Sequence, residues 1–304
     1  MKSVPVFPRK RPVELSDKLF FDRYVKKFPP EISEITFTNI FAWRHAYQFE
    51  LSILDDFLLV ISSTPQGLEI FEPIGVFGHK RDVVESCFYR VQAGLPMKFV
   101  RLTEATIESF RDEAVFKVAE DRDNDDYLYA RRDLVELPGA KYDGKRNLIR
   151  RFQESQPFVY KKLSKNDIVQ CLYFQENWCA VKNCCHTKGF LNEKQACVEM
   201  LENFEDLNIF GAMIEIGSKV EAVTLAQELN PETIVIHMEK ANDSFMGIYQ
   251  AINHLFALSL PSEYRFINRQ QDLGVEGLRI AKQSYHPCRM VKKYTLSQRP
   301  SESS

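Results

Sequence analysis

The sequence lacks a strong excess of either charge, and it lacks long apolar runs. Its 40 Lys and Arg residues nearly balance its 42 Asp and Glu residues, which leaves a formal net charge of -2 at pH 7. This balance gives no overall attraction to DNA or to an anionic membrane, although a local basic groove remains compatible with it. No segment approaches the roughly 18 uninterrupted apolar residues of a membrane-spanning helix. The basic, proline-containing start has no apolar core of a signal peptide, so we expect a cytoplasmic protein without a transmembrane segment.

Cysteine motifs are also missing. The seven cysteines are odd in number, and their spacing forms no disulfide framework. The densest group of potential metal ligands is Cys179, Cys184, Cys185 and His186. It contains no Cys-x-x-Cys pair, so small buried thiols explain this group better than a zinc site does. We expect no bound metal and no covalently bound cofactor.

Two further motifs are incomplete or absent. The segment 121–125 has the first spacings of a calcium loop, but Asp126 stands where such a loop needs Gly and Arg132 where it needs Glu. Neither a G-x-S-x-G nor a Walker sequence is present. The sequence motifs therefore give no specific support to a serine or cysteine nucleophile.

What the sequence does contain is typical of folded domains. Hydrophobic residues make up 44% and charged residues 27%, and the 23 Phe and 12 Tyr supply core material. A length of 304 residues suits one large domain or two of ordinary size. Hydrophobic periodicity predicts helices and antiparallel strands in both halves, with a boundary near 157–165. We therefore expect an α+β fold with an N-terminal domain over 1–160, a C-terminal domain over 161–298 and a disordered tail over 299–304.

Both halves are expected to follow one order of elements: helices, antiparallel strands, then a strand, a loop and a helix. The first half predicts helices at 14–28, around Trp43, at 81–92, 103–110 and 145–156, and strands at 48–54, 57–63, 68–71, 97–102 and 127–137. The second half predicts helices at 165–182, 193–203, 244–258 and 276–284, and strands at 209–216, 220–229, 233–238, 264–268 and 288–296.

The first candidate site is a basic segment that is expected to follow a strand and to open a helix. Its members are Lys141, Tyr142, Asp143, Gly144, Lys145, Arg146 and Asn147. Backbone N–H groups at a helix start attract anions, and Gly144 would let a ligand approach the backbone closely. A pyrophosphate or a nucleic-acid phosphate would fit there. A glycine turn followed by a solvated basic helix face explains the segment equally well.

The second candidate site is the polar segment that follows the strand ending near residue 268. Asn268, Arg269, Gln270, Gln271 and Asp272 are consecutive, and Arg279, Lys282, Ser284, Tyr285 and His286 follow on the next helix. Polar side chains at the end of a strand are well placed to line a cleft. Asn268 and Arg269 would hold a carbonyl or a carboxylate, since Arg offers a planar two-pronged donor. An ordinary strand–helix connection explains any one of these residues, but their density favours a functional site.

Glu215 is a third candidate, because it interrupts an apolar strand. A carboxylate that faces a cleft there would act as a base, since burial raises the pKa of a carboxyl group. On an alternating strand it equally points to solvent, and this second interpretation is somewhat favoured.

With these residues in view, the chain resembles proteins related to the C-terminal domain of phosphatidylglycerol lysyltransferase. The matching pieces are Thr36–Asn39 with Trp43-Arg44, Phe71–Gly75, Asp126–Tyr129, Tyr142–Asn147, and Asn268–Gly274 through Tyr285-His286-Pro287. They span nearly the whole chain, and the last two are the most specific. That family is similar to tandem GNAT (acyl-CoA N-acyltransferase-like) proteins, including the Fem-type aminoacyl transferases. The resemblance implies two GNAT-like domains, each with a mixed, mostly antiparallel sheet flanked by helices.

The resemblance also implies a function. It predicts an acyl- or aminoacyltransferase that moves an acyl group from acyl-CoA or aminoacyl-tRNA to an amine or hydroxyl acceptor. Carried onto this chain, Gly144–Asn147 takes the place of the pyrophosphate loop, with Lys145-Arg146 where the usual loop has a second small residue. That departure suits a bulkier polyanion as well as CoA.

The expected roles at the second site follow from acyl-transfer chemistry. The catalytic set is Glu215, Arg269, Asp272, Lys282 and Tyr285, and the substrate-binding set is Asn268, Gln271 and His286. Glu215 or Asp272 would take the proton of the amine, Arg269 would hold the oxyanion, and Tyr285 or a lysine would protonate the leaving group. The alternatives are a non-catalytic protein that binds a nucleotide-like or polyanionic ligand in an inter-domain cleft and, ranked lower, an RNA-binding protein with a basic groove.

Overall fold

The computed structural model describes residues 3–91, 95–111, 114–182 and 188–299. The chain divides into two compact units. The first comprises Met1–Asp126, Gln271–Glu276 and Met290–Ser304, and the second comprises Tyr127–Gln270 and Gly277–Arg289. The boundary expected between residues 160 and 161 therefore lies within the second unit. The reason is long-range strand pairing, which local sequence patterns do not reveal.

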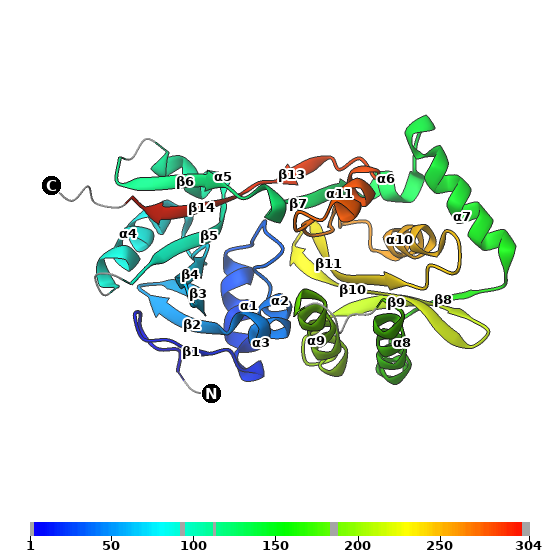
Figure 1. Cartoon of the computed structure of the whole chain (residues 1–304), viewed down its shortest axis with the longest axis horizontal. Helices are drawn as coiled ribbons and strands as arrows, with labels where there is room; N and C mark the ends of the chain where they lie inside the picture. The colour runs from blue at the N-terminus through cyan, green and yellow to red at the C-terminus, as the bar shows by residue number, and fades with distance from the viewer. Residues whose placement is uncertain (1–2, 92–94, 112–113, 183–187, 300–304) are drawn as a thin grey trace. The chain divides into compact units, whose positions relative to one another are not determined.

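The first unit contains a seven-stranded sheet of order β1-β2-β3-β4-β5-β14-β6 (Figure 1). Its strands are β1 (Arg11–Pro12), β2 (Phe49–Leu54), β3 (Phe57–Thr64), β4 (Gly67–Phe71), β5 (Met97–Thr103), β6 (Phe116–Glu120) and β14 (Lys293–Gln298). The pairs β2–β3 and β3–β4 are antiparallel, which confirms the expected meander, and β4 runs parallel to β5. The sheet is completed by β14, which pairs with both β5 and β6.

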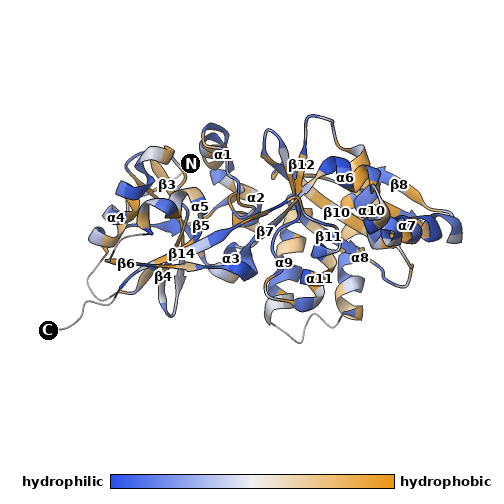
Figure 2. Cartoon of the chain, turned by 90° about the horizontal axis from the view of Figure 1, so that it is seen from above, coloured by the Kyte–Doolittle hydropathy of each residue, from blue (hydrophilic) through white to orange (hydrophobic). Residues whose placement is uncertain are grey.

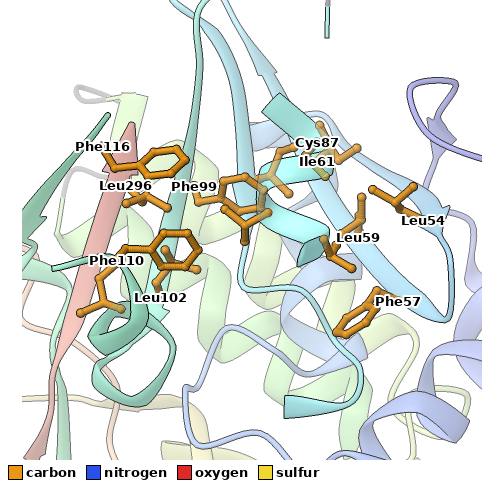
Figure 3. Close-up of a cluster of buried hydrophobic side chains, with 14 of the residues drawn as sticks. Leu54, Phe57, Leu59, Ile61, Cys87, Phe99, Leu102, Phe110, Phe116 and Leu296 are labelled. Atoms are coloured by element: carbon orange, nitrogen blue, oxygen red, sulfur yellow. The ribbon is translucent and has the colours of Figure 1, made fainter. Parts of the chain in front are cut away.

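A hydrophobic core covers one face of this sheet. It joins side chains of the strands to those of α4 (Lys80–Arg90) and of the turn after α5 (Glu104–Ile107). Figure 3 shows Leu59, Ile61 and Phe99 of the strands together with Cys87 of α4 and Phe110. The six residues Phe57–Ser62 of β3 are all buried, as expected of a central strand that is covered on both faces.

The helices α1 (Lys18–Lys27), α2 (Phe37–Ala42) and α3 (Arg44–Tyr47) also belong to the first unit. The ring of Phe21 packs edge-on against Phe37, which stacks on Phe41. The Thr36 hydroxyl accepts a hydrogen bond of 3.2 Å from the Asn39 N–H, so it caps α2 as the sequence predicts. In contrast, α3 buries no residue and is coloured hydrophilic in Figure 2.

The second unit contains a sheet of order β13-β7-β12-β11-β10-β9-β8. Its strands are β7 (Asp126–Ala130), β8 (Val159–Lys162), β9 (Phe210–Ile216), β10 (Lys219–Asn230), β11 (Thr233–Ala241), β12 (Phe266–Asn268) and β13 (Arg289–Val291). Among the pairs with a defined register, β11–β12 is parallel and the rest are antiparallel. Figure 1 shows α8 (Ile168–Val181) and α9 (Lys188–Glu202) on one side of the sheet and α10 (Ile248–Ser259) on the other.

The remaining helices of this unit are α6 (Arg131–Glu136), α7 (Asp143–Ser155) and α11 (Glu276–Gln283). Both α6 and α7 pack against α10. Each unit is thus a mixed, mostly antiparallel sheet flanked by helices, which confirms the expected α+β class. No helix among the described residues is long and apolar enough to cross a membrane.

Four predicted details differ from the structure. The strand expected at 127–137 ends at Ala130 and is followed by α6, and the single strand expected at 288–296 is divided into β13 and β14. The short strands β6 and β8 were not predicted, because half-exposed residues give them no apolar alternation. Of the expected disordered tail, Arg299 is described and its Nε donates to the Phe116 carbonyl at 2.9 Å, while residues 300–304 lie outside the described residues.

A buried lysine holds three distant segments of the first unit together. Lys293 is fully buried, and its Nζ donates to Glu34 Oε2 at 2.5 Å and to Asp126 Oδ1 at 2.7 Å. The backbone N–H and the hydroxyl of Ser33 each donate to Asp126 at 2.8 Å. The Lys293 N–H donates to Asp125 Oδ1 at 2.8 Å. Every charge in this group has a partner, as buried charges require.

Lys293→Met should strongly destabilise the first unit. Removing the ammonium would take the lysine partner away from two buried carboxylates, Glu34, which keeps Arg101 at 3.0 Å, and Asp126, at a cost of about 3–5 kcal/mol. Urea unfolding followed by tryptophan fluorescence would measure the change. Lys292→Met is the matched control, because Lys292 is exposed and its loss should change stability by less than about 0.5 kcal/mol. Equal stability of the two variants would contradict the structural role of the ion cluster.

Candidate functional site

In the second sheet, the pairing between β11 and β12 ends at Asn268, well before the end of β11. Strand β12 pairs with β11 from Thr233↔Phe266 to Val235↔Asn268, and β11 then continues to Ala241. Beyond Asn268 the chain stays hydrogen-bonded to β7 instead, because Arg269 N–H donates to the Tyr127 carbonyl at 3.0 Å. The carboxyl ends of two parallel strands thus part here, which is a common place for a ligand in α/β sheets.

Arg269 and Glu239 form an ion pair at this position. The Arg269 Nη2 lies 2.7 Å from Glu239 Oε1, and the two side chains are only 16% and 9% exposed. Asn253 of α10 donates to the other Glu239 oxygen at 3.1 Å. The second guanidinium nitrogen, Arg269 Nη1, is buried and has no hydrogen-bond partner among the described residues. A buried donor without a partner is rare, so this nitrogen is the candidate donor to a ligand acceptor at the site.

Aromatic rings surround the Arg269 guanidinium. Its carbon lies 5.6 Å from the centre of the Tyr129 ring and 4.9 Å from that of Tyr285. Burial raises the pKa of both phenols far above the ordinary value, and the opposing effect of Arg269 is smaller. Both phenols therefore stay protonated at neutral pH and are weaker acids than a solvent-exposed tyrosine.

Helix α11 is fixed to this site by Lys282. The Lys282 Nζ donates to the Arg269 carbonyl at 2.5 Å and lies 5.7 Å from the centre of the Tyr127 ring. The Tyr129 hydroxyl donates to the Lys282 carbonyl at 2.7 Å. Lys282 thus positions the segment that carries Arg269.

The start of α7 reaches the same group of residues. The Lys145 Nζ lies 4.1 Å from the centre of the Tyr285 ring and donates to Ser284 Oγ at 2.7 Å. The buried Tyr142 hydroxyl donates to the Tyr285 carbonyl at 2.9 Å, and its ring meets His286 edge-on at 5.3 Å. Tyr142 and Lys145 of the first candidate segment therefore lie next to Arg269, Ser284 and Tyr285 of the second, all within the second unit.

Other members of the basic segment have local partners. Arg146 donates to the carbonyls of Leu137 and Gly139 and pairs with Asp143, while Asn147 accepts from Arg150 at 3.0 Å. Lys141 lies over the Tyr142 ring at 5.1 Å. An added Cβ on Gly144 would meet nothing within 4 Å, and the segment follows α6 and a short 3-10 turn where a strand was expected. These contacts describe a solvated helix start.

Three predicted residues are not part of this group. Glu215 lies on β9, two positions from β11 in the sheet, where Lys161 of β8 binds its carboxylate at 2.9 Å. Asp272 and Gln271 belong to the first unit, where Arg122 pairs with Asp272 at 3.2 Å and Gln271 donates to Glu34 at 2.9 Å. Asn268 is buried beside the site, and its side-chain oxygen accepts from the Gln270 N–H at 2.8 Å.

Glu239, Tyr129 and His237 were missed at the sequence level. The only signal for His237 and Glu239 is the alternation His237-Met238-Glu239, which on a regular strand places both polar side chains on one face, but the pairing of β11 with β10 has a register shift at His237. His237 lies within 3.3 Å of Gln227 Oε1 and 3.5 Å of Gln270 Nε2, and burial lowers its pKa to about 3. The imidazole is therefore neutral under physiological conditions.

The low pKa of His237 predicts acid-sensitive folding. Between the ordinary pKa of about 6.5 and the folded value of about 3, the unfolded chain binds a proton at His237 that the folded chain does not. Stability should therefore fall as the pH falls through this window. His237→Gln should lose less stability between pH 7 and pH 4 than the parent in urea titrations. An identical pH dependence in both proteins would contradict the assignment.

The described residues contain no group of three or more His, Cys, Asp or Glu side chains suited to a metal ion. Cys184, Cys185 and His186 lie outside the described residues, and Cys179 is buried, with its sulfur accepting from Gln175 Nε2 at 3.5 Å.

Comparisons with known proteins point in one direction. A family model described as phosphatidylglycerol lysyltransferase, C-terminal, matches residues 26–297. Among curated proteins, none matches the chain significantly.

Solved structures agree with the family match. A conserved protein of unknown function from Bacteroides thetaiotaomicron is 32% identical, covers 95% of this chain and 99% of its own, and has a TM-score of 0.86. L-PGS from Bacillus licheniformis is 13% identical, with a TM-score of 0.66 over 99% of this chain and 95% of its own. FemX is 8% identical, with a TM-score of 0.61 over 95% of this chain and 96% of its own. The last two likenesses concern the fold.

Proposed function

The chain belongs to the family of the phosphatidylglycerol lysyltransferase C-terminal domain, and from this premise we propose that it transfers an aminoacyl or acyl group. The donor would be a carrier such as tRNA or CoA, and the acceptor an amine or a hydroxyl. The tandem GNAT-like fold agrees with this class of reaction. Fold and family leave the substrates open, so the proposal depends on the side chains of the site.

The observation that carries the proposal is the buried, unpartnered Nη1 of Arg269. Its neighbour Nη2 is fixed by Glu239, so the guanidinium has a defined orientation. Leaving a buried donor without an acceptor costs about 1–3 kcal/mol. A carbonyl oxygen of a bound donor would remove that cost, and the interaction would strengthen as the oxygen becomes negative.

This geometry fits the chemistry of acyl transfer. Attack on the carbonyl carbon places negative charge on its oxygen, and a preorganised cation stabilises that charge most in the transition state. Glu239 keeps the guanidinium in place, and its carboxylate would accept a proton from an attacking amine. The Tyr285 ring lies beside the guanidinium, so its hydroxyl would act as a hydrogen-bond donor to the leaving group.

A polyanionic carrier is supported by the charges on α7. Lys141, Arg150 and Arg151 are exposed cations on or next to this helix, which also contributes Lys145 to the site. Phosphates of either tRNA or CoA would be attracted to these side chains. Two acidic residues of the same helix reduce this attraction locally: Asp143 in the first turn, which pairs with Arg146, and Glu154 near the C-terminal end.

Arg269→Lys should reduce transfer by roughly 100- to 1,000-fold, because removal of one oxyanion donor has an effect of this size. The assay would follow loss of label from aminoacyl-tRNAs and acyl-CoAs in the presence of a panel of amines and hydroxyl compounds. Arg265→Lys is the matched control, since Arg265 is exposed and forms a surface pair with Glu232. Its activity should equal that of the parent.

Two results would count against the proposal. Parent activity in Arg269→Lys would exclude this site as the place of transfer. Tight binding of a carrier without turnover by any acceptor would favour a binding protein that kept the fold.

A further inference from the structure

Lys145 and Ser284 form a close pair beside the site. The Lys145 Nζ lies 2.7 Å from Ser284 Oγ, and both residues are partly exposed, so a ligand is able to reach them. Ser284 immediately follows α11 and precedes Tyr285, whose ring is contacted by both Lys145 and Arg269. A hydroxyl and an amine at this distance have the spacing of a nucleophile and its base.

The surroundings of Lys145 differ from those of the surface lysines. Lys161 and Lys182 are each bound to carboxylates, and these partners raise their pKa values. No carboxylate pairs with Lys145 in the part of the chain that the structure describes. Burial and, to a lesser degree, the nearby charge of Arg269 lower the pKa of Lys145. A larger share of neutral amine is therefore available to accept a proton.

We propose that Ser284 and Lys145 form a nucleophile–base pair that carries the acyl group covalently between donor and acceptor. The inference rests on the proposed transfer function and adds an acyl-enzyme step to it. The pair is supported by the short Nζ–Oγ distance, by the absence of a carboxylate at Lys145 and by its position next to Tyr285 and Arg269.

The step balances as follows in atoms and charge. Neutral Lys145 Nζ takes the proton of Ser284 Oγ while that oxygen forms a bond to the donor's carbonyl carbon. The bond from this carbon to the carrier oxygen or sulfur breaks, and the carrier leaves with the proton that Lys145 took up. The acceptor amine or hydroxyl then attacks the ester on Ser284, loses its proton and returns Oγ–H to serine.

The competing explanation is a purely structural hydrogen bond between α7 and the end of α11. Ser284 Oγ also donates to the Ala281 carbonyl at 2.6 Å, which a merely structural serine does as well. Lys145→Arg separates the two explanations. An arginine keeps the charge, the contact with the Tyr285 ring and a donor for Ser284 Oγ, but it does not lose its proton at accessible pH.

The experiment uses p-nitrophenyl acetate as acyl donor with the full-length chain. Intact-mass spectrometry and peptide mapping should find one acetyl group on Ser284 in the parent, formed faster as the pH rises. Ser284→Ala should abolish this site of labelling. Lys145→Arg should slow it by about 100-fold or more, in the range of general-base effects, while keeping the melting temperature.

Ser155→Ala is the matched control. Ser155 follows the same pattern at the end of α7, since its Oγ donates to the Phe152 carbonyl three residues earlier at 2.9 Å, and no lysine is bound to it. Its labelling at Ser284 should equal that of the parent. Absence of acetyl on Ser284 in the parent, or unchanged labelling in Lys145→Arg, would overturn the proposal.

The same variants distinguish this inference from the proposed function. If the parent transfers an aminoacyl or acyl group and Ser284→Ala does so at the same rate, transfer is direct and only the acyl-enzyme step is wrong. If no carrier donates to any acceptor although Ser284 is acetylated and depends on Lys145, the nucleophile–base pair stands and the transferase function falls.

Discussion

The ion pair between Arg269 and Glu239 is the constraint on which the second unit's site depends. It joins the end of β12 to β11 at the point where their backbone pairing has already stopped. The contact between the two side chains therefore links the end of β12 to β11 where no backbone pairing does. In this ion pair, Arg269 Nη2 is bound to Glu239, and Nη1 remains available for a ligand.

The first unit uses buried charge in a different way. Lys293, Glu34 and Asp126 come from segments far apart in the sequence, and Arg101 supplies the second cation through its contact with Glu34. Such a group adds little net stability compared with apolar packing, but only one arrangement of the segments satisfies it. The two units therefore illustrate two uses of buried ions: one completes its own hydrogen bonding and specifies the fold, and the other leaves a donor unfilled.

Local signals in the sequence predicted most helices and hairpins, and they failed where distant segments pair. The turn at Asp55-Asp56 and the cap at Thr36 are local, whereas the positions of β7 and β14 depend on strands far away. The same limit applies to the site. Glu215 and Glu239 look alike as single acidic residues in apolar strands, and only their partners, Lys161 and Arg269, separate a surface ion pair from a buried one. Ser284 was noted as a donor, but its lysine partner lies 139 positions earlier.

The course of the chain has a consequence for biosynthesis. Because β14 lies between β5 and β6, the first sheet is incomplete until Lys293–Gln298 have left the ribosome. The second sheet includes β7, so a fragment that begins at residue 161 lacks one of its inner strands. Neither half of the gene, cut at that position, encodes a complete sheet. Folding of either sheet therefore has to follow synthesis of strands on both sides of that position.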